Sequence, residues 1–244
     1  MNMPNSGFQW SRTASVDQAV YDEGLRRHML RVYNYMALGL VLTGAVAFTV
    51  GTTPALYVPI FSTPLKWVVM LAPLAFVLFF SFRMQSMSAS GAQTMFWAFC
   101  GVMGLSMASI FLVFTGTSIA RTFFIAATMF GATSLYGYTT KRDLSQFGSF
   151  LIMGLIGVVI ASLVNIFLGS TMLQFIVSVV GILVFVGLTA WDTQRIKSDF
   201  VAYSYAEGTA EAGKRSVLDA LSLYLNFINL FMLMLQFMGV RQQD

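Results

Sequence analysis

Long runs of apolar residues, separated by short polar segments, make up most of the chain. Each run approaches the roughly 20 residues that an α-helix needs to cross the hydrocarbon core of a bilayer. A membrane β-barrel would instead show segments of about ten residues with alternating polarity. The pattern predicts seven transmembrane helices over residues 32–50, 65–82, 94–114, 122–138, 147–168, 172–191 and 217–240.

The polar ends of the chain complete the predicted organisation. Residues 1–20 lack the apolar core of a secretory signal and are expected to form a mobile tail. Residues 21–31 place acids before bases, which suits a short juxtamembrane helix because the charges complement the helix dipole. We therefore expect a tail and juxtamembrane helix over residues 1–30, a membrane domain over residues 31–240 and a short tail over residues 241–244.

The composition excludes a soluble protein. Hydrophobic residues make up 57% of the 244 residues and charged residues only 10%, with a mean hydropathy of +0.74. Soluble domains carry about 25% charged residues. An aromatic content of 15% also argues against a disordered chain. The fold class is therefore predicted to be an all-α integral membrane protein.

Scarce cysteine and histidine restrict the possible chemistry. Cys100 is the single cysteine, so neither an intrachain disulfide nor a cysteine metal cluster can form, and we expect a packing role for it. The single histidine, His28, precedes the first predicted span. A histidine-ligated metal or a serine–histidine dyad within the membrane is therefore excluded. No cofactor and no metal are expected.

The basic residues predict the orientation. Eleven of the 14 Lys and Arg residues lie on the side of the N-terminus, and three, Lys66, Arg121 and Arg241, lie on the other. The positive-inside rule then places the N-terminus in the cytoplasm, and seven spans leave the C-terminus outside. Because the bases are scattered among spans, they indicate a bilayer rather than a nucleic acid as partner.

Three acidic residues adjoin the predicted spans: Asp143, Asp192 and Asp219. Asp143 lies in the polar turn KRDLS, where it can cap the fifth span. Asp192 follows GILVFVGLTAW and leads into TQRIK on the same helix. A helix C-terminus and lost hydration both favour the neutral form of an acid, so Asp192 could change protonation near neutral pH. The alternative is a water-exposed loop acid.

Two further features could cooperate with Asp192. Arg83 closes the second span on the same side and offers a counter-charge, or serves as an ordinary membrane anchor. A polar stripe on the seventh span should face protein or water rather than lipid, because unpaired polar groups are costly in hydrocarbon. It predicts a water-accessible path, or alternatively only hydrogen bonds between helices. The stripe comprises Asp219, Ser222, Asn226 and Asn229.

Several blocks of the sequence together resemble the Bax inhibitor-1 family, also called the transmembrane Bax-inhibitor-motif family, and its bacterial members in particular. They are YDEGLRRHMLRVYNYMALGL (21–40), SFRMQSMS (81–88), GATSLYGYTTKRDLSQFGSFL (131–151), TAWDTQRIK (189–197) and ALSLYLNFINLF (220–231). The resemblance covers nearly the whole chain. It implies a bundle in which six helices surround the seventh, and a pH-sensitive calcium leak.

The resemblance also implies a pH sensor. In it, an aspartate on helix six pairs with one on helix seven, and an arginine on helix two can latch the first. Asp192 matches the helix-six aspartate and Arg83 the arginine. At the helix-seven position this chain has Asn226, which does not titrate. Asp219, two turns away, is the alternative second acid.

The predicted function is a pH-sensitive calcium leak channel of the bacterial inner membrane, gated by protonation near Asp192, with Ser222 and Asn229 lining its path. Calcium is then the transported ion. The first alternative is a non-conducting regulatory scaffold that binds other membrane proteins. The second is an intramembrane aspartyl protease using Asp192 and Asp219, against which the seventh span begins LDALS and lacks the GxGD signature.

Overall fold

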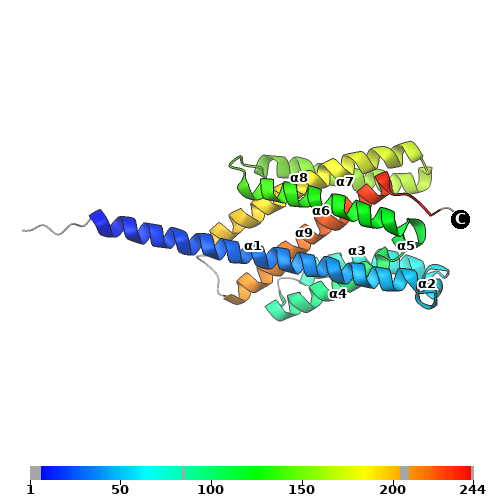
Figure 1. The fold of residues 1–244 in the computed structure, drawn as a ribbon, viewed down its shortest axis with the longest axis horizontal. Coiled ribbons are helices and arrows are strands. Elements are labelled where there is room, and N and C mark those ends of the chain that lie inside the picture. The colour runs from blue at the N-terminus through cyan, green and yellow to red at the C-terminus, as the bar shows by residue number, and fades with distance from the viewer. Residues whose placement is uncertain (1–6, 84–85, 204–208, 243–244) are drawn as a thin grey trace, which may run out of the picture.

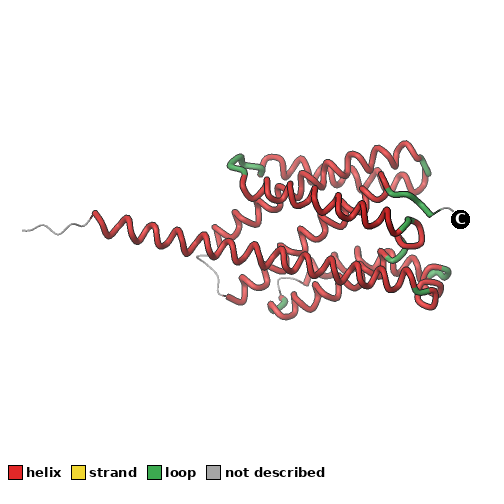
Figure 2. The backbone as a smooth tube through the Cα atoms, in the orientation of Figure 1, coloured by secondary structure: helices red, strands yellow, loops and turns green. Residues whose placement is uncertain are grey.

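The computed structural model describes residues 7–83, 86–203 and 209–242, and helices joined by short loops fill almost all of this range (Figures 1 and 2). No β-strand occurs among the described residues, in agreement with the predicted all-α class. The helices are α1 (Gly7–Thr52), α2 (Pro54–Phe61), α3 (Leu65–Arg83), α4 (Ala89–Met107), α5 (Ile110–Val113), α6 (Gly116–Thr139), α7 (Ser145–Leu168), α8 (Thr171–Tyr203) and α9 (Thr209–Met238).

Six of the described helical segments are long and apolar enough to cross a bilayer. A seventh is added if the bent pair Pro54–Phe61 and Leu65–Phe80, whose axes meet at 89°, counts as one span. Large apolar side chains cover the outside of the bundle, and Phe82, Phe124 and Phe167 are 69–89% exposed. Soluble monomers rarely present so much contiguous apolar surface, so this surface suits a lipid environment.

The first helix is longer than the sequence predicted. α1 runs without a break from Gly7 to Thr52, so residues 7–20 are helical where a mobile tail was expected. No proline lies between residues 5 and 53 to end the helix, and the expected juxtamembrane helix is simply part of α1. Residues 1–6 lie outside the described range.

The core of the bundle is built around α9. α9 is the most buried of the candidate spans and packs mainly against α1, α4, α6 and α8. α3 packs on α4 and α7 packs on α8, so these two helices lie farther out (Figure 1). The fully buried side chains of α9 include Leu223, Tyr224 and Leu230. Because lipid is as apolar as these side chains, close packing and interhelical hydrogen bonds hold α9 at the centre.

A buried hydroxyl pair joins α9 to α1 and α4. The Tyr224 hydroxyl lies 2.6 Å from Oγ1 of Thr43, which donates to the carbonyl oxygen of Cys100 over 3.0 Å. Cys100 itself is fully buried, consistent with the expected packing role. The core therefore contains a satisfied polar connection across three helices.

The segment after α9 is fixed to the α5–α6 connection. The backbone N–H of Thr115 donates to the carbonyl of Val240 over 3.0 Å, and that of Gln242 donates to Val113 over 2.9 Å. The N–H of Val240 donates to Oγ of Ser118 over 2.8 Å. We call residues 240–242, held by these bonds, the C-terminal clamp.

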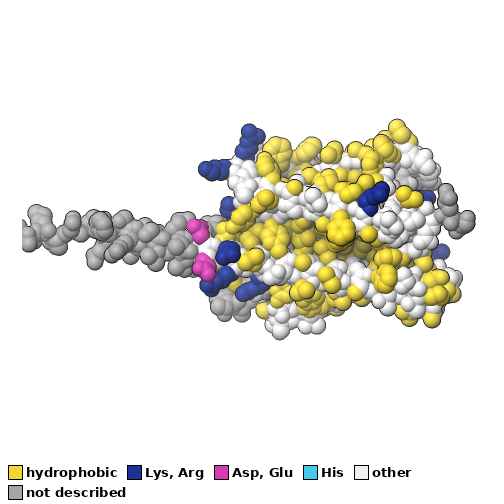
Figure 3. All heavy atoms as spheres, in the orientation of Figure 1, with side chains coloured by type: hydrophobic (Ala, Val, Ile, Leu, Met, Phe, Trp, Pro, Cys, Tyr) yellow, Lys and Arg dark blue, Asp and Glu magenta, His cyan; other side chains and the backbone are white. Residues whose placement is uncertain are grey.

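The two ends of the bundle differ in charge. Lys and Arg side chains gather at the end from which α1 projects, as the visible face shows (Figure 3). This basic end includes residues 26–31 of α1, the α6–α7 loop and the polar parts of α8 and α9, whereas α2, α5 and the C-terminal clamp lie at the opposite end (Figure 1).

Candidate functional site

Asp192 lies inside α8 rather than at its end. The helix continues for about three turns beyond it, to Tyr203, because TQRIK extends the same helix as predicted. The terminal dipole therefore acts beyond Asp192 and not on it. Asp192 is only 5% exposed, so the alternative of a water-exposed loop acid is wrong.

Both carboxylate oxygens of Asp192 have partners. Oδ1 forms an ion pair with Nη2 of Arg195 at 2.7 Å. Oδ2 accepts a hydrogen bond from Nδ2 of Asn226 over 2.6 Å and from Oγ of Ser222 over 3.2 Å. We call these four residues the Asp192 cluster. It joins α8 to α9 and satisfies a buried carboxylate, which would otherwise be costly.

Arg195 is the partner that the sequence reasoning missed. It lies three residues after Asp192 on the same helical face, a spacing that favours an ion pair. Its guanidinium stacks 5.0 Å from the ring centre of Trp191. Arg83, the predicted counter-charge, is exposed at the end of α3, which packs against α4. Among the described residues, the structure brings Arg195 and not Arg83 to Asp192.

Asp219 belongs to a different contact. Its Oδ2 lies 3.0 Å from Nε2 of His28, and the other ring nitrogen lies 3.2 Å from Oγ of Ser216. His28 is buried because α1 begins well before the predicted span and packs there against α9. The structure therefore gives Asp192 the amide of Asn226 as its partner on α9, and gives Asp219 to α1.

The polar stripe of α9 lines a cavity of about 590 Å³ between α7, α8 and α9. Ser222, Asn226 and Asn229 all lie on its wall, together with Asp192 and Arg195. The amide of Asn229 donates to the carbonyl of Leu225 in its own helix over 2.8 Å. Asp219, the fourth predicted member, is not part of this wall. The remaining lining is mostly apolar.

The residues beside Asp192 fix it from two more directions. Oγ1 of Thr193 lies 2.9 Å from Oγ of Ser134 on α6. Gln194 accepts the N–H of Leu144 over 2.7 Å and donates to the carbonyl of Arg142 over 2.8 Å, both at the α6–α7 loop. Three consecutive residues of α8 thus contact α9, α6 and this loop. Any movement at Asp192 is coupled to all three.

Asp143 was predicted to cap the fifth span, but the N-cap position of α7 is Leu144, which has no side-chain cap, and Asp143 contacts only the first residue of the helix. Its Oδ1 accepts the N–H of Ser145 over 2.8 Å. Hydrogen bonds from the Ser145 side chain and backbone hold the pKa of Asp143 below its ordinary value. Asp143 is therefore a local structural group and not part of the Asp192 cluster.

The arrangement around Asp192 suits proton-linked rearrangement more than metal binding. No group of three or more His, Cys, Asp or Glu side chains within the described part of the chain could hold a metal ion. A buried acid that bridges two helices on the wall of a cavity can instead accept or release a proton and alter their contact.

Comparison with known proteins places the chain in a family. Residues 25–243 match the family model described as inhibitor of apoptosis-promoting Bax1. The chain is 49% identical to an uncharacterized Rickettsia prowazekii protein over 94% of this chain and 96% of that protein. It is 44% identical to the Escherichia coli inner membrane protein YbhL over 90% of this chain and 94% of YbhL. With a family match over most of its length and relatives this similar, the chain belongs to the Bax inhibitor family of membrane proteins.

Proposed function

We propose that the protein is a pH-sensitive calcium leak of the bacterial inner membrane, gated by protonation of Asp192. The observation that supports this most is the Asp192 cluster itself, a buried carboxylate that links α8 to α9 on the wall of a cavity. The location is supported by the similarity to YbhL, which is named an inner membrane protein.

Protonation would weaken the cluster in a defined way. The charged Asp192 attracts the Arg195 guanidinium and accepts two hydrogen bonds from α9. A neutral acid loses the ion pair and accepts weaker hydrogen bonds, so the contact between α8 and α9 loosens. In the proposed open state, water and cations follow the polar wall made by Ser222, Asn226 and Asn229.

The polar wall offers ligands of the right type for calcium. Hydroxyl and amide oxygens and water are hard ligands, which suit Ca²⁺ in weak and transient coordination. We further propose that the basic end faces the cytoplasm, because basic residues are retained on that side of a membrane. The Asp192 cluster would then respond to cytoplasmic pH.

The test is calcium entry into sealed vesicles that contain only this protein and an internal calcium indicator. Asp192→Asn keeps the size of the side chain but removes its titration. We expect this variant to pass calcium at a rate that no longer changes between pH 6 and 8. Asp143→Asn, which alters an exposed acid outside the cluster, is the matched control and should keep the wild-type response.

Two results would contradict the proposed function. Identical pH responses for wild type and Asp192→Asn would remove Asp192 from gating. No calcium entry at any pH would favour the alternative function, a scaffold that binds other membrane proteins.

The protease alternative gains no support from the geometry. Two catalytic carboxylates need to share a proton, whereas here Asp192 contacts Arg195 and Asn226 and Asp219 contacts His28.

A further inference from the structure

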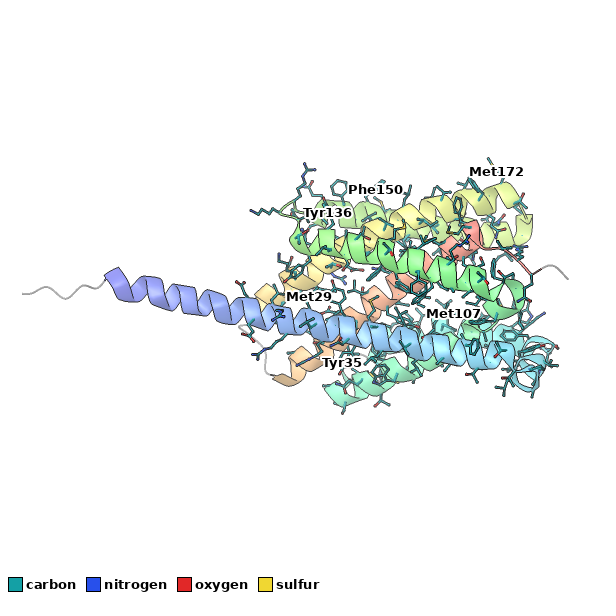
Figure 4. The ribbon with its side chains drawn as sticks, in the orientation of Figure 1. Met29, Tyr35, Met107, Tyr136, Phe150 and Met172 are labelled. Atoms are coloured by element: carbon teal, nitrogen blue, oxygen red, sulfur yellow. The ribbon has the colours of Figure 1, made fainter. Side chains whose placement is uncertain are left out.

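A second cavity of about 600 Å³ opens between α1 and α6 in the basic half of the bundle. Apolar side chains of both helices form its walls, and Met29, on the α1 wall, is labelled in Figure 4. Its volume is within the usual range of ligand sites. We call it the α1–α6 groove, defined by Met29, Tyr33, Met36, Phe130, Ser134 and Leu135.

The polar groups in the groove do not need water. The hydroxyl of Tyr33 lies 2.6 Å from Oγ of Ser134, which in turn lies 2.9 Å from Oγ1 of Thr193. Thr193 donates onward to the carbonyl of Thr189 over 2.8 Å. Because these groups satisfy one another, the groove presents an effectively apolar interior and favours an apolar occupant.

The rim of the groove is positively charged. Arg26 and Tyr138 both line the groove. Lys197 donates to the carbonyl of Tyr138 over 3.0 Å and lies 5.1 Å from the Tyr138 ring centre. On α1, Glu23 is held by Arg27 at 2.7 Å, and none of the described carboxylates lines the groove. The rim therefore suits an anion.

The length of the groove matches one leaflet of a bilayer. From Arg26 to Ala37, both of which line it, α1 rises about 17 Å at 1.5 Å per residue. Half of a hydrocarbon core about 30 Å thick is close to this length. Both walls belong to candidate membrane spans, so the solvent beside the groove is lipid.

We propose that the α1–α6 groove binds one membrane phospholipid, with an acyl chain along the apolar walls and the phosphate at Arg26 and Lys197. The phosphate accepts charge-assisted hydrogen bonds from both cations. The acyl chain contacts Tyr33 and Ser134, which line the groove; Ser134 is bonded to Thr193, and Thr193 adjoins Asp192. The bound lipid thus holds α1 against α6 and reaches α8 through Lys197, near the Asp192 cluster. This site stands whether or not the protein conducts calcium.

The experiment uses the full chain in vesicles of phosphatidylethanolamine and phosphatidylglycerol, with a photoreactive group on the phosphatidylglycerol acyl chain. We expect crosslinks on α1 and α6 along the groove, and one phospholipid retained by the purified protein in native mass spectrometry. Gly131→Leu adds bulk to the groove from an open position, since Gly131 lines the groove and an added Cβ there meets no heavy atom within 4 Å. This variant should lose the retained lipid and the crosslinks.

Gly157→Leu is the matched control, because Gly157 is also exposed and open on α7 but lies outside the groove. It should retain the lipid as wild type does. Arg26→Gln should lower the preference for phosphatidylglycerol about five-fold, since each base near anionic lipid contributes on that scale. Ala37→Phe, on the opposite wall, replaces Gly131→Leu if thermal unfolding shows that variant to be misfolded. Equal retention by the filled and control variants would overturn the proposal.

Discussion

Asn226 occupies the position where the family resemblance implies an aspartate, and its amide donates to Asp192 over 2.6 Å. An amide stabilises the carboxylate without adding a second negative charge, so Arg195 alone balances Asp192 within the cluster. Two carboxylates in this position would repel each other and titrate as a coupled pair. This chain should therefore respond to pH as a single-proton switch.

Replacing Asn226→Asp tests this directly. The new carboxylate would lie against Asp192, and one of the two acids would keep its proton to a higher pH. We expect the midpoint of the calcium-flux titration to move to higher pH, by about one unit or more. Asn229→Asp, on the same cavity wall but without contact to Asp192, should move it much less. A larger shift for Asn229→Asp than for Asn226→Asp would mean that Asn226 is not the partner of Asp192.

Asp143 offers a simpler pH test. Its pKa lies below the ordinary value because Ser145 donates hydrogen bonds to the charged form. A group with a lowered folded pKa stabilises the fold above its unfolded pKa, and this contribution disappears as the pH falls through the folded pKa. Ser145→Ala should raise the pKa of Asp143 toward the ordinary value, as measured by carboxyl carbon NMR. Thr140→Ala, which changes a hydroxyl bonded to Arg142, should leave it unchanged.

At the scale of helices, the apolar pattern predicts the parts that lie in lipid and not the parts that lie in water. The predicted spans 65–82 and 147–168 nearly coincide with α3 and α7. α1 and α8 extend far beyond their apolar runs, because a polar helix forms the same backbone bonds and gives no hydropathy signal. The predicted third span, 94–114, is divided into α4 and α5.

The apolar pattern also explains which residues of the site could be identified from the sequence and which could not. Asp192 and Asn226 were identifiable because polar residues inside apolar runs are conspicuous. Their contact with each other depends on how α8 and α9 pack, which the pattern of one helix does not contain. Arg195 had a local signal, the spacing of three residues from Asp192. His28 became a partner of Asp219 only because α1 starts early and packs against α9 there.

Close packing between α6 and α8 gives a prediction for two glycines on one helix. A Cβ added at Gly137 would lie 2.9 Å from Cα of Ala190, whereas one at Gly131 meets nothing within 4 Å. Gly137→Ala should lower the free energy of unfolding by about 1–3 kcal/mol through overpacking. Gly131→Ala should raise it by up to about 1 kcal/mol through helix propensity. Thermal unfolding in detergent would measure both, and equal stabilities would contradict the observed packing.

At the scale of the whole molecule, charge and connectivity agree. α1 enters the bundle at the basic end, and the C-terminal clamp lies at the opposite end (Figure 1). A chain that enters at one end and leaves at the other crosses an odd number of times, which suits seven crossings with α3 as the second. The bases predict a cytoplasmic location for the basic end, since eleven of 14 are assigned to one side.

This arrangement predicts the topology in the membrane. A reporter that is active only in the cytoplasm should be silent when fused after Asp244 and active when fused before Met1. The physical reason is that basic segments resist transfer across the membrane during insertion. Activity of the C-terminal fusion would mean an even number of crossings. A variant without the bases Lys141 and Arg142 is the control, because the other basic residues on that side should preserve the orientation.

The C-terminal clamp determines how the central helix can move. Two backbone hydrogen bonds and a third to Oγ of Ser118 hold the chain just beyond α9 to the α5–α6 connection, while the Asp192 cluster holds the middle of α9. If the cluster releases, α9 cannot slide along its axis like a piston, because its far end stays anchored. The motion that the clamp leaves open is a rotation of α9 about the clamp. The largest displacement would then fall at the basic end, where α9 must also separate from α1 at the contact between Asp219 and His28.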